Sequence, residues 1–285
     1  MKNVAVLMTV FGRRDFTVKC LTKFYDAMKL TPQINYDIYL LDDASIDDTY
    51  TVISNLFPSV NLIKGEGNLF WCRGMIEAWK IASKIEYDGF ILLNNDSYIF
   101  EDGLSVLFSN SFSTGNNSII SGAFKSEFNE KATYGGRLKG QLINLAPNGE
   151  LQKIEWLNGN FVLIPKKIFD KIGMLDSVFH HSIGDYDYGL RAIKAGFKVF
   201  LTEKYVGTCE EHYKKQDCYD KEISLYKRVK NFYSPLGDNP FQRFIFLNRH
   251  ESFLKASSAF VITHLYVFFP IFLDWYESRK LRRAE

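Results

Sequence analysis

A cluster of polar side chains ends the apolar run GFILL in the stretch GFILLNNDSYIF, residues 89–100. Asn94, Asn95 and Asp96 are adjacent there, and apolar residues resume beyond them. Oxygen-bearing side chains of this kind bind hard divalent cations such as Mg²⁺ or Mn²⁺, which in turn can hold a diphosphate. Asp96 is the one carboxylate of the three. Most of the negative charge around such an ion must therefore come from the ligand itself.

A second acidic group, Asp42 and Asp43, follows the apolar run IYLL. Adjacent residues of an extended chain point to opposite sides, so we expect one of the two carboxylates to face a ligand. At the end of a strand, a carboxylate can hydrogen-bond a base or a ribose. The same residues can also cap the turn that begins with DDAS, and both interpretations stay open here.

A third acidic group lies in GDYDYGLRA, where Asp185 and Asp187 are two residues apart. In a helix this spacing separates their side chains by ~200°, so they cannot share one task. Asp187 and Arg191 are at i and i+4 and can pair. Asp185 is then available at the helix start as a general base, with helix capping as the alternative.

The loop after the first apolar run reads FGRRDF and contains a single glycine. It lacks the G-x-G-x-x-G pattern of dinucleotide-binding sites, which argues against a dehydrogenase. Arg13 and Arg14 are suited to a diphosphate, although two arginines in a loop are also commonly solvated.

Alternating strand and helix patterns must position these groups. They predict a mostly parallel, doubly wound α/β sheet with helices on both faces, in which ligands bind beyond the carboxyl ends of the strands. Loops are expected across 113–150. The expected strands are 3–10, 36–43, 60–65, 89–93, 155–165 and 197–202, and the expected helices are 14–30, 45–57, 74–85, 166–173 and 184–196.

Composition narrows the class of protein. The chain has 285 residues, of which 46% are hydrophobic, enough for one large α/β domain with an appendage. The net charge of +2 argues against a general nucleic-acid-binding role. Four scattered cysteines and a start without a signal-peptide pattern predict a cytoplasmic protein with reduced thiols.

The segment 256–273, ASSAFVITHLYVFFPIFL, is unusually apolar and precedes the basic sequence SRKLRR. Its 18 residues are borderline for a membrane span, which usually needs ~20. An aromatic and basic flank suits peripheral contact with an anionic membrane leaflet, such as the inner face of the cell membrane. A helix packed on the domain, followed by a solvated tail, fits the segment equally well.

Six motifs in order resemble the family-2 inverting glycosyltransferases with a GT-A fold, particularly rhamnosyltransferase-like bacterial enzymes that build capsule, O-antigen or other surface polysaccharides. The resemblance covers about residues 3–215. The motifs are VLMTVFGRRDF, YLLDDASIDDT, GNLFWCRGM, LLNNDSY, NGNFVLIPKKIFDKIGMLD and GDYDYGLRAIKAG.

The resemblance implies roles for individual residues. Asp185 matches the catalytic base, and Asp96, in the place of the metal-binding DxD motif, matches the ligand of Mn²⁺ or Mg²⁺, with His212 as a further metal ligand. Two positions depart from the family pattern, because Gly184 and Asn94 stand where acidic residues are usual. The residues matched to nucleotide or donor binding are Thr9, Arg13, Asp43, Asn68, Trp71, Arg73, Met75, Asn94 and Asn95.

The resemblance predicts a GT-A domain over 1–230, and the composition of the remaining chain predicts a helical segment over 231–285 that is a candidate for contact with a membrane. The donor would be a UDP- or dTDP-sugar and the acceptor a glycan or lipid-linked glycan, with no nucleic-acid partner. Two alternatives remain at this point: a non-catalytic protein that binds a nucleotide sugar or a glycan, and a sugar-phosphate nucleotidyltransferase. The loop FGRRDF suits the latter poorly, because such enzymes open with a Gly-rich loop.

Overall fold

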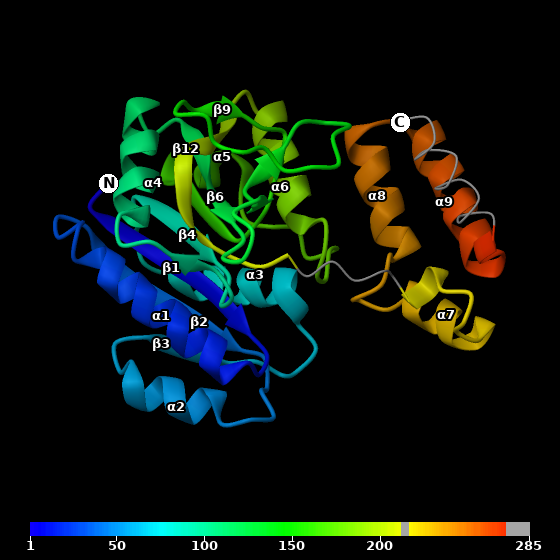
Figure 1. Ribbon diagram of the computed structural model, residues 1–285, viewed down its shortest axis with the longest axis horizontal. Helices are drawn as coiled ribbons and strands as arrows, with labels where there is room; N and C mark the ends of the chain where they lie inside the picture. The colour runs from blue at the N-terminus through cyan, green and yellow to red at the C-terminus, as the bar shows by residue number, and fades with distance from the viewer. Residues whose placement is uncertain (212–216, 272–285) are drawn as a thin grey trace. The chain divides into compact units, whose positions relative to one another are not determined.

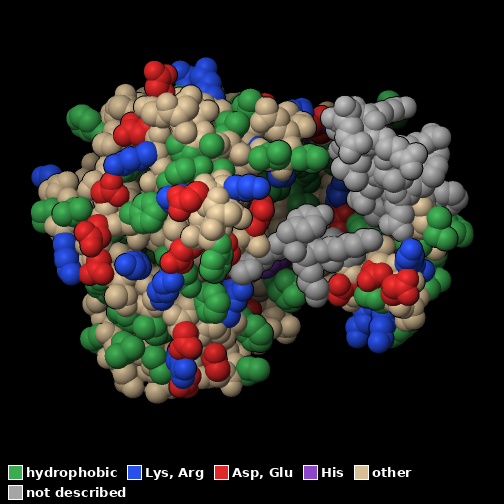
Figure 2. All heavy atoms as spheres, viewed as in Figure 1, with side chains coloured by type: hydrophobic (Ala, Val, Ile, Leu, Met, Phe, Trp, Pro, Cys, Tyr) green, Lys and Arg blue, Asp and Glu red, His purple; other side chains and the backbone are tan. Residues whose placement is uncertain are grey.

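The computed structural model describes residues 1–211 and 217–271 (Figure 1). The chain divides into two compact units. The sheet unit consists of Met1–Ser177 and Gly184–Glu211, and the helical unit consists of Val178–Ile183 and the chain from residue 212 onward. On the face drawn in Figure 2, basic and acidic side chains are interspersed over the sheet unit.

The sheet unit is built on a ten-stranded mixed sheet in the order β3-β2-β1-β4-β11-β6-β12-β5. Strands β3, β2, β1 and β4 are mutually parallel, β11 is antiparallel to both of its neighbours, and β6 and β12 are parallel. The expected α/β fold with a mostly parallel sheet is confirmed. The strands of this path are β1 Asn3–Val10, β2 Asn35–Asp42, β3 Asn61–Lys64, β4 Gly89–Leu93, β5 Tyr98–Ile99, β6 Ser118–Lys125, β11 Phe161–Pro165 and β12 Lys198–Thr208.

Helices cover both faces of this sheet, because alternate residues of each strand point to opposite sides. Val4, Val6 and Met8 of β1 belong to a core cluster that includes residues of α1 and α4. On the other side, Trp79 of α3 contacts Phe169 of α5 and Tyr188 of α6. The helices of the sheet unit are α1 Arg14–Met28, α2 Thr49–Leu56, α3 Phe70–Ala82, α4 Gly103–Ser113, α5 Lys166–Ile172 and α6 Gly184–Lys194.

The region 113–150 differs from the expected loops, because it contains β6, which is buried along nearly its whole length, and two further short strands. Its Gly- and Asn-rich composition reflects turns between strands. The expected strand 155–165 is also divided, since residues 158–160 separate β10 from β11. The short strands are β7 Ala132–Tyr134, paired with β6; β9 Gln152–Lys153, paired with β12; and β8 Gly136–Arg137 with β10 Trp156–Leu157, which form a two-stranded sheet.

In its described residues the helical unit contains the 3₁₀ turn η1 and three helices, two of which start at a side-chain cap. Asn239 accepts hydrogen bonds from the first turn of α8, and Ser252 caps α9 by accepting from the backbone N–H of Lys255. A small core forms where Cys218, Phe232 and Val267 meet. The elements are η1 Asp217–Tyr219, α7 Leu225–Phe232, α8 Pro240–His250 and α9 Phe253–Phe268.

All four cysteines are buried and free, as the sequence predicts for reduced thiols. Cys20 and Cys209 belong to the sheet-unit core, and Cys218 lies in the small core of the helical unit. None of the helices in the described parts of the chain is long and apolar enough to cross a membrane.

Candidate active site

The candidate site lies at one edge of the sheet, where β1, β2 and β4 end and β11 begins. Because β11 runs antiparallel to β4, its first residue, Phe161, is paired with the last residue of β4, Leu93. The polar residues just before β11 are therefore brought beside those just after β4. Parallel sheets present their ligand sites at this edge, as the sequence predicts for the acidic groups.

Arg13 and Asp96 form an ion pair at this edge. Arg13 lies in the left-handed region, with φ 63°, directly before α1. Its Nη1 donates to Asp96 Oδ2 at 2.9 Å, and its guanidinium lies 5.2 Å from the ring centre of Phe16. Arg14 pairs instead with Asp15 and Asp48, and these two carboxylates raise its pKa. Of the two arginines, Arg13 is therefore the one that meets the candidate metal residue.

Asp43 is buried and organises the loop that leads into α3. Its Oδ1 accepts from the backbone N–H of Gly67 at 2.8 Å, and its Oδ2 accepts from Leu69 at 2.8 Å and from Phe70 at 3.1 Å. The neighbouring Asp42 turns the other way and accepts from the N–H of Ser45 at 2.8 Å. The two carboxylates thus have different tasks, as expected for adjacent residues of a strand.

The residues from Asn68 to Met75 that the resemblance matches to donor binding occupy different environments. Trp71 donates from Nε1 to Asn94 Oδ1 at 2.7 Å, and Arg73 donates to the carbonyl of Ser177 at 2.9 Å. Asn68 is exposed, whereas Met75 has no exposed surface and lies in the core. Met75 therefore supports the packing of α3 rather than offering its side chain to a ligand.

Asn94 and Asn95 hold the turn after β4 in place. Asn94 donates its backbone N–H to the carbonyl of Asn160 at 2.9 Å. Asn95 is buried and donates from Nδ2 to Thr17 Oγ1 at 3.0 Å. Both amides thus make contacts within the protein, which leaves Asp96 as the member of the three with a carboxylate for a cation.

Thr9, near the end of β1, lies against helix α3. A Cβ atom added to Gly74 would lie 2.3 Å from Thr9 Oγ1, so glycine allows this close approach. Thr9 is partly exposed at the strand edge. Its hydroxyl is therefore packed against α3, near the strand ends where the polar residues converge.

Asp185, the second residue of α6, accepts two backbone hydrogen bonds. Its Oδ2 accepts from Gly159 N–H at 3.0 Å, and its Oδ1 accepts from Tyr186 N–H at 2.9 Å. Removal from bulk water raises the pKa of this carboxyl to about 6, while the two hydrogen bonds and the charge of Arg137 partly oppose that rise. A partly exposed carboxylate with a pKa near neutrality has the properties of a general base.

Asp187, two residues later, has a structural role. It is buried and pairs with Arg191 at 2.8 Å, as its i, i+4 spacing predicts. Arg191 also donates to the carbonyls of Ile172 and Met174. The ion pair therefore ties α6 to the segment after α5.

The sequence NGN, residues 158–160, joins the two halves of the site, and its role was not foreseen from the residues. Gly159 donates to Asp185 and lies so close to Trp71 that an added Cβ would be 2.4 Å from the indole ring. Trp71 in turn bonds to Asn94. The signal in the sequence was three small or amide residues interrupting the expected strand 155–165. They connect Asp185 to the turn that carries Asp96.

Arg137 and Tyr186 form a second group near Asp185 that sequence patterns did not single out. The Arg137 guanidinium lies 4.9 Å from the ring centre of Trp156 and 5.4 Å from that of Tyr186. The Tyr186 hydroxyl accepts weakly from Arg137 and from Asn158, at 3.4 and 3.5 Å. A cation and aromatic rings therefore lie close to Asp185.

Asp96 is the one carboxylate in the turn after β4 and makes contacts through both of its oxygens. Its Oδ2 accepts from Arg13, and its Oδ1 lies 4.0 Å from Cys209 Sγ. Over residues 1–211 and 217–271, no group of three or more His, Cys, Asp or Glu side chains could hold an ion by itself. Mg²⁺ commonly takes one or two protein carboxylates plus substrate phosphates, so Asp96 fits an ion bound together with a diphosphate. His212 lies outside the described residues.

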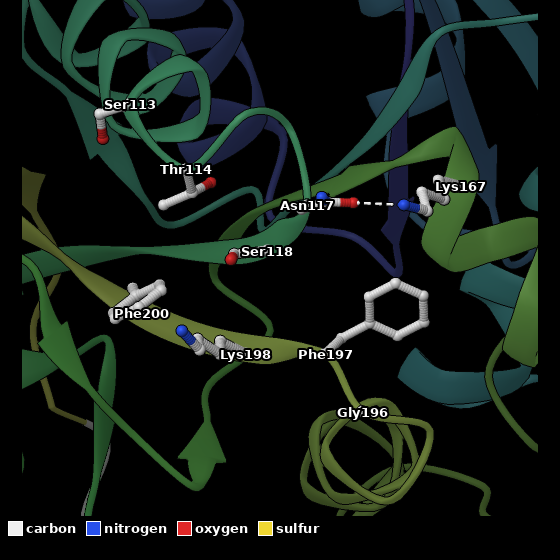
Figure 3. Close-up of a pocket in the computed structure, with 9 residues that line it drawn as sticks. All are labelled: Ser113, Thr114, Asn117, Ser118, Lys167, Gly196, Phe197, Lys198 and Phe200. Carbon is white, nitrogen blue, oxygen red and sulfur yellow. Dashed lines mark hydrogen bonds between the residues drawn. The ribbon is translucent and has the colours of Figure 1, made fainter.

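A separate hollow lies at the other edge of the sheet, where β6 and β12 begin (Figure 3). Lys167 donates to Asn117 Oδ1 at 2.8 Å on its wall, and the ring of Phe197 faces the same space. None of the residues predicted from the sequence to bind a ligand lines it. Its lining residues are Ser113, Thr114, Asn117, Ser118, Lys167, Gly196, Phe197, Lys198 and Phe200.

Comparisons with known proteins agree with this architecture. The family model described as "Glycosyl transferase family 2" matches residues 5–179. A search of curated proteins found no match. Among solved structures, the chain is similar to the mannosyltransferase PcManGT from Pyrobaculum calidifontis in complex with GDP-Man and Mn²⁺, with a TM-score of 0.58, 11% identity, and coverage of 93% of this chain and 70% of that chain.

A second similar structure is S. aureus TarS 1–349 in complex with UDP-GlcNAc, with a TM-score of 0.53 and 11% identity. The alignment covers 93% of this chain and 73% of that chain. At this level of identity the two structures establish the shared fold, and the family model establishes the family.

Proposed function

The chain belongs to glycosyl transferase family 2, and we propose that it is an inverting enzyme that moves a sugar from a UDP- or dTDP-linked donor to a hydroxyl of a glycan acceptor. The observation that carries this proposal is the contact chain from Asp185 through Gly159 and Trp71 to Asn94, two residues before Asp96. It links a carboxyl with a raised pKa to the candidate diphosphate site. A transferase needs these two functions side by side.

Asp185 is the proposed base. It takes the proton from the acceptor hydroxyl as that oxygen attacks the anomeric carbon and the bond to the nucleoside diphosphate breaks. One in-line displacement inverts the configuration at that carbon. The hydrogen bonds from Gly159 and Tyr186 fix the orientation of the carboxylate, so proton transfer requires little rearrangement.

Asp96 and Arg13 are proposed to serve the leaving group. When bound, a Mn²⁺ or Mg²⁺ ion neutralises charge on the departing diphosphate. Asp96 would hold that ion, with His212 as a proposed further ligand, and Arg13 would then be released from Asp96 to meet a phosphate oxygen. The residues proposed for the donor are Thr9, Arg13, Asp43, Asn68, Trp71, Arg73, Asn94 and Asn95.

The biological setting we propose is the synthesis of a bacterial surface polysaccharide of the capsule or O-antigen type, by a rhamnosyltransferase-like enzyme in the cytoplasm. The order of the six motifs supports the type of enzyme. The four buried, free cysteines support its location in the cytoplasm. The proposed organisation is a transferase domain over 1–230 followed by the appendage 231–285.

The test is a transfer assay with a panel of UDP- and dTDP-sugars, a mixture of glycan acceptors and Mn²⁺, with chelator as the comparison. We expect release of the nucleoside diphosphate and a product whose anomeric configuration, measured by NMR, is opposite to that of the donor. A product with retained configuration would overturn the inverting mechanism. Donor binding without turnover for every pair would favour the non-catalytic alternative.

The Arg13–Asp96 ion pair predicts how the metal binds. Without a nucleotide, a cation must displace Arg13 from Asp96 Oδ2, so we expect weak Mn²⁺ binding to the free protein and much tighter binding with UDP or dTDP present. Arg13→Gln removes the competing charge and should raise the affinity of the free protein for Mn²⁺ several-fold, while it lowers nucleotide affinity. Calorimetric titration measures both affinities.

Arg14→Gln is the matched control, because Arg14 is the next residue and pairs with Asp15 and Asp48 instead. It should leave both affinities unchanged. Tight Mn²⁺ binding to the wild-type protein without nucleotide would contradict the proposed competition.

A further inference from the structure

One face of helix α9 is buried within the helical unit, and the opposite face exposes large apolar side chains. Ala256, Thr263 and Val267 are buried against the rest of the helical unit. On the opposite side an apolar stripe remains exposed, although its residues are large. The apolar stripe consists of Leu254 (80% exposed), Val261 (56%), Ile262 (43%), Leu265 (47%) and Phe268 (47%).

The spacing of the apolar stripe places its members on one side of α9, with the exposed Ser258 lying between Leu254 and Val261. Its members follow one another at intervals of seven, one, three and three residues, which keeps them within an arc of ~120° of the helix. The stripe extends over ~20 Å of helix. An exposed apolar surface of this length on one helix indicates a site that is covered by a partner.

The charge of the chain is divided unevenly between its two units. Residues 212–285 contain 13 Lys and Arg against eight Asp and Glu, a net charge of +5, and residues 178–183 carry none. The remaining residues contain 22 basic against 25 acidic side chains, a net charge of −3. Four of the basic residues, Arg279, Lys280, Arg282 and Arg283, follow α9 closely in the sequence. The unit that exposes the apolar stripe is thus the positively charged one.

We propose that the apolar stripe of α9 docks the protein on an anionic lipid surface. The apolar residues would enter the boundary between headgroups and acyl chains, and the net positive charge of the helical unit would attract the anionic headgroups. With 16 residues, α9 is shorter than the ~20 needed to span a bilayer, so it would lie along the surface. A second copy of the chain fits less well, because a two-fold contact through this stripe would bring two units of charge +5 together.

The direct test is flotation of the full-length protein with vesicles of phosphatidylcholine alone or mixed with phosphatidylglycerol. We expect binding to the anionic vesicles, little binding to the neutral ones, and a loss of binding as salt is raised. Equal binding to both vesicle types, or binding to neither, would overturn the proposal.

Two exposed stripe residues allow a variant that should still fold. V261E/L265E places two carboxylates on the docking face and should weaken vesicle binding by at least ~10-fold. I46E/F128E is the matched control, because it makes the same change of charge at residues that are 94% and 86% exposed on the sheet unit. The control should bind vesicles within about twofold of wild type, since its two added charges lie on the sheet unit and leave the apolar stripe itself unchanged.

Thermal unfolding and the hydrolysis of donor without vesicles check that both variants retain their fold and catalytic site. Analytical ultracentrifugation of the wild-type protein tests the alternative partner, a second copy of the chain. A dimer that V261E/L265E dissociates, together with no vesicle binding, would assign the stripe to a second copy and overturn the lipid proposal. Loss of vesicle binding with unchanged donor hydrolysis would support docking whether or not the proposed acceptor is correct.

Discussion

The Asp185→Asn variant is expected to lower the transfer rate by about 10²- to 10⁴-fold, the range that general-base catalysis typically contributes. The asparagine can still accept a backbone hydrogen bond from Gly159 or Tyr186, so the start of α6 should keep its shape. Affinity for the nucleoside diphosphate should therefore remain close to that of wild type. Transfer kinetics and calorimetry measure the two effects, and wild-type turnover would exclude Asp185 as the base.

The activity of the wild-type enzyme should depend on pH in the way that a base at Asp185 requires. Loss of solvent raises the pKa of Asp185 to about 6, and only the ionised carboxylate can take a proton. We therefore expect kcat/KM to fall as the pH drops below about 6 and to level off above it. The Asp185→Asn variant should lack this acidic limb.

The free energy of unfolding should change with pH in the direction opposite to kcat/KM. The folded pKa of Asp185 lies above its ordinary value, so the folded state loses stability as the pH rises from about 4 to about 6 and this desolvated carboxyl ionises. Asp185→Asn should thus be more stable than wild type at pH 8 and similar at pH 4. Asp187→Asn, on the same helix, is the control: it disrupts the ion pair with Arg191 and should lose stability while keeping the acidic limb.

Replacing Asp43 with Asn should have a large effect on the loop that leads into α3. The Asp43 carboxylate accepts three backbone hydrogen bonds from Gly67, Leu69 and Phe70, and an amide oxygen can replace only one carboxylate oxygen. Charge-assisted bonds of this kind contribute about 1.5–3 kcal/mol each, so we expect a loss of about 3 kcal/mol in the free energy of unfolding. Nucleotide affinity should also fall, because the loop into α3 loses its anchor.

Asp42→Asn provides a close comparison for that measurement. Asp42 is the adjacent, equally buried carboxylate, but only its Oδ1 accepts a hydrogen bond, from Ser45, among the described residues. The amide oxygen preserves that bond, so the change in urea-induced unfolding should be small. Similar losses for both variants would show that the three bonds of Asp43 do not dominate the stability of the loop.

Sequence patterns predicted where the strands of the parallel half end, and hence which polar residues gather there. Alternation of apolar runs and helical periods is a local signal, so β1, β2 and β4 could be recognised from residues close in the chain. The i, i+4 pair of Asp187 and Arg191 was predictable for the same reason.

The remaining contacts depend on strand direction, which no local period encodes. The antiparallel course of β11 brings Gly159 to Asp185 and Asn160 to Asn94, across 26 and 66 residues of sequence respectively. Burial also changed the expected role of Met75, because a motif fixes the position of a residue in the chain but not the direction of its side chain on α3. The roles of Asn94 and Asn95 within the turn became clear only from their partners, Trp71 and Thr17.

The position of β11 also has a consequence during synthesis on the ribosome. Its neighbour β4, all of whose residues are buried in the finished sheet, is complete at residue 93, but β11 begins only at residue 161. At the usual elongation rates of about 5–20 residues per second, several seconds pass between the synthesis of β4 and that of β11, its second neighbour in the sheet. An apolar strand edge of this kind promotes aggregation until it is paired. Protection of the nascent chain by chaperones is therefore most needed while residues 94–160 are being made.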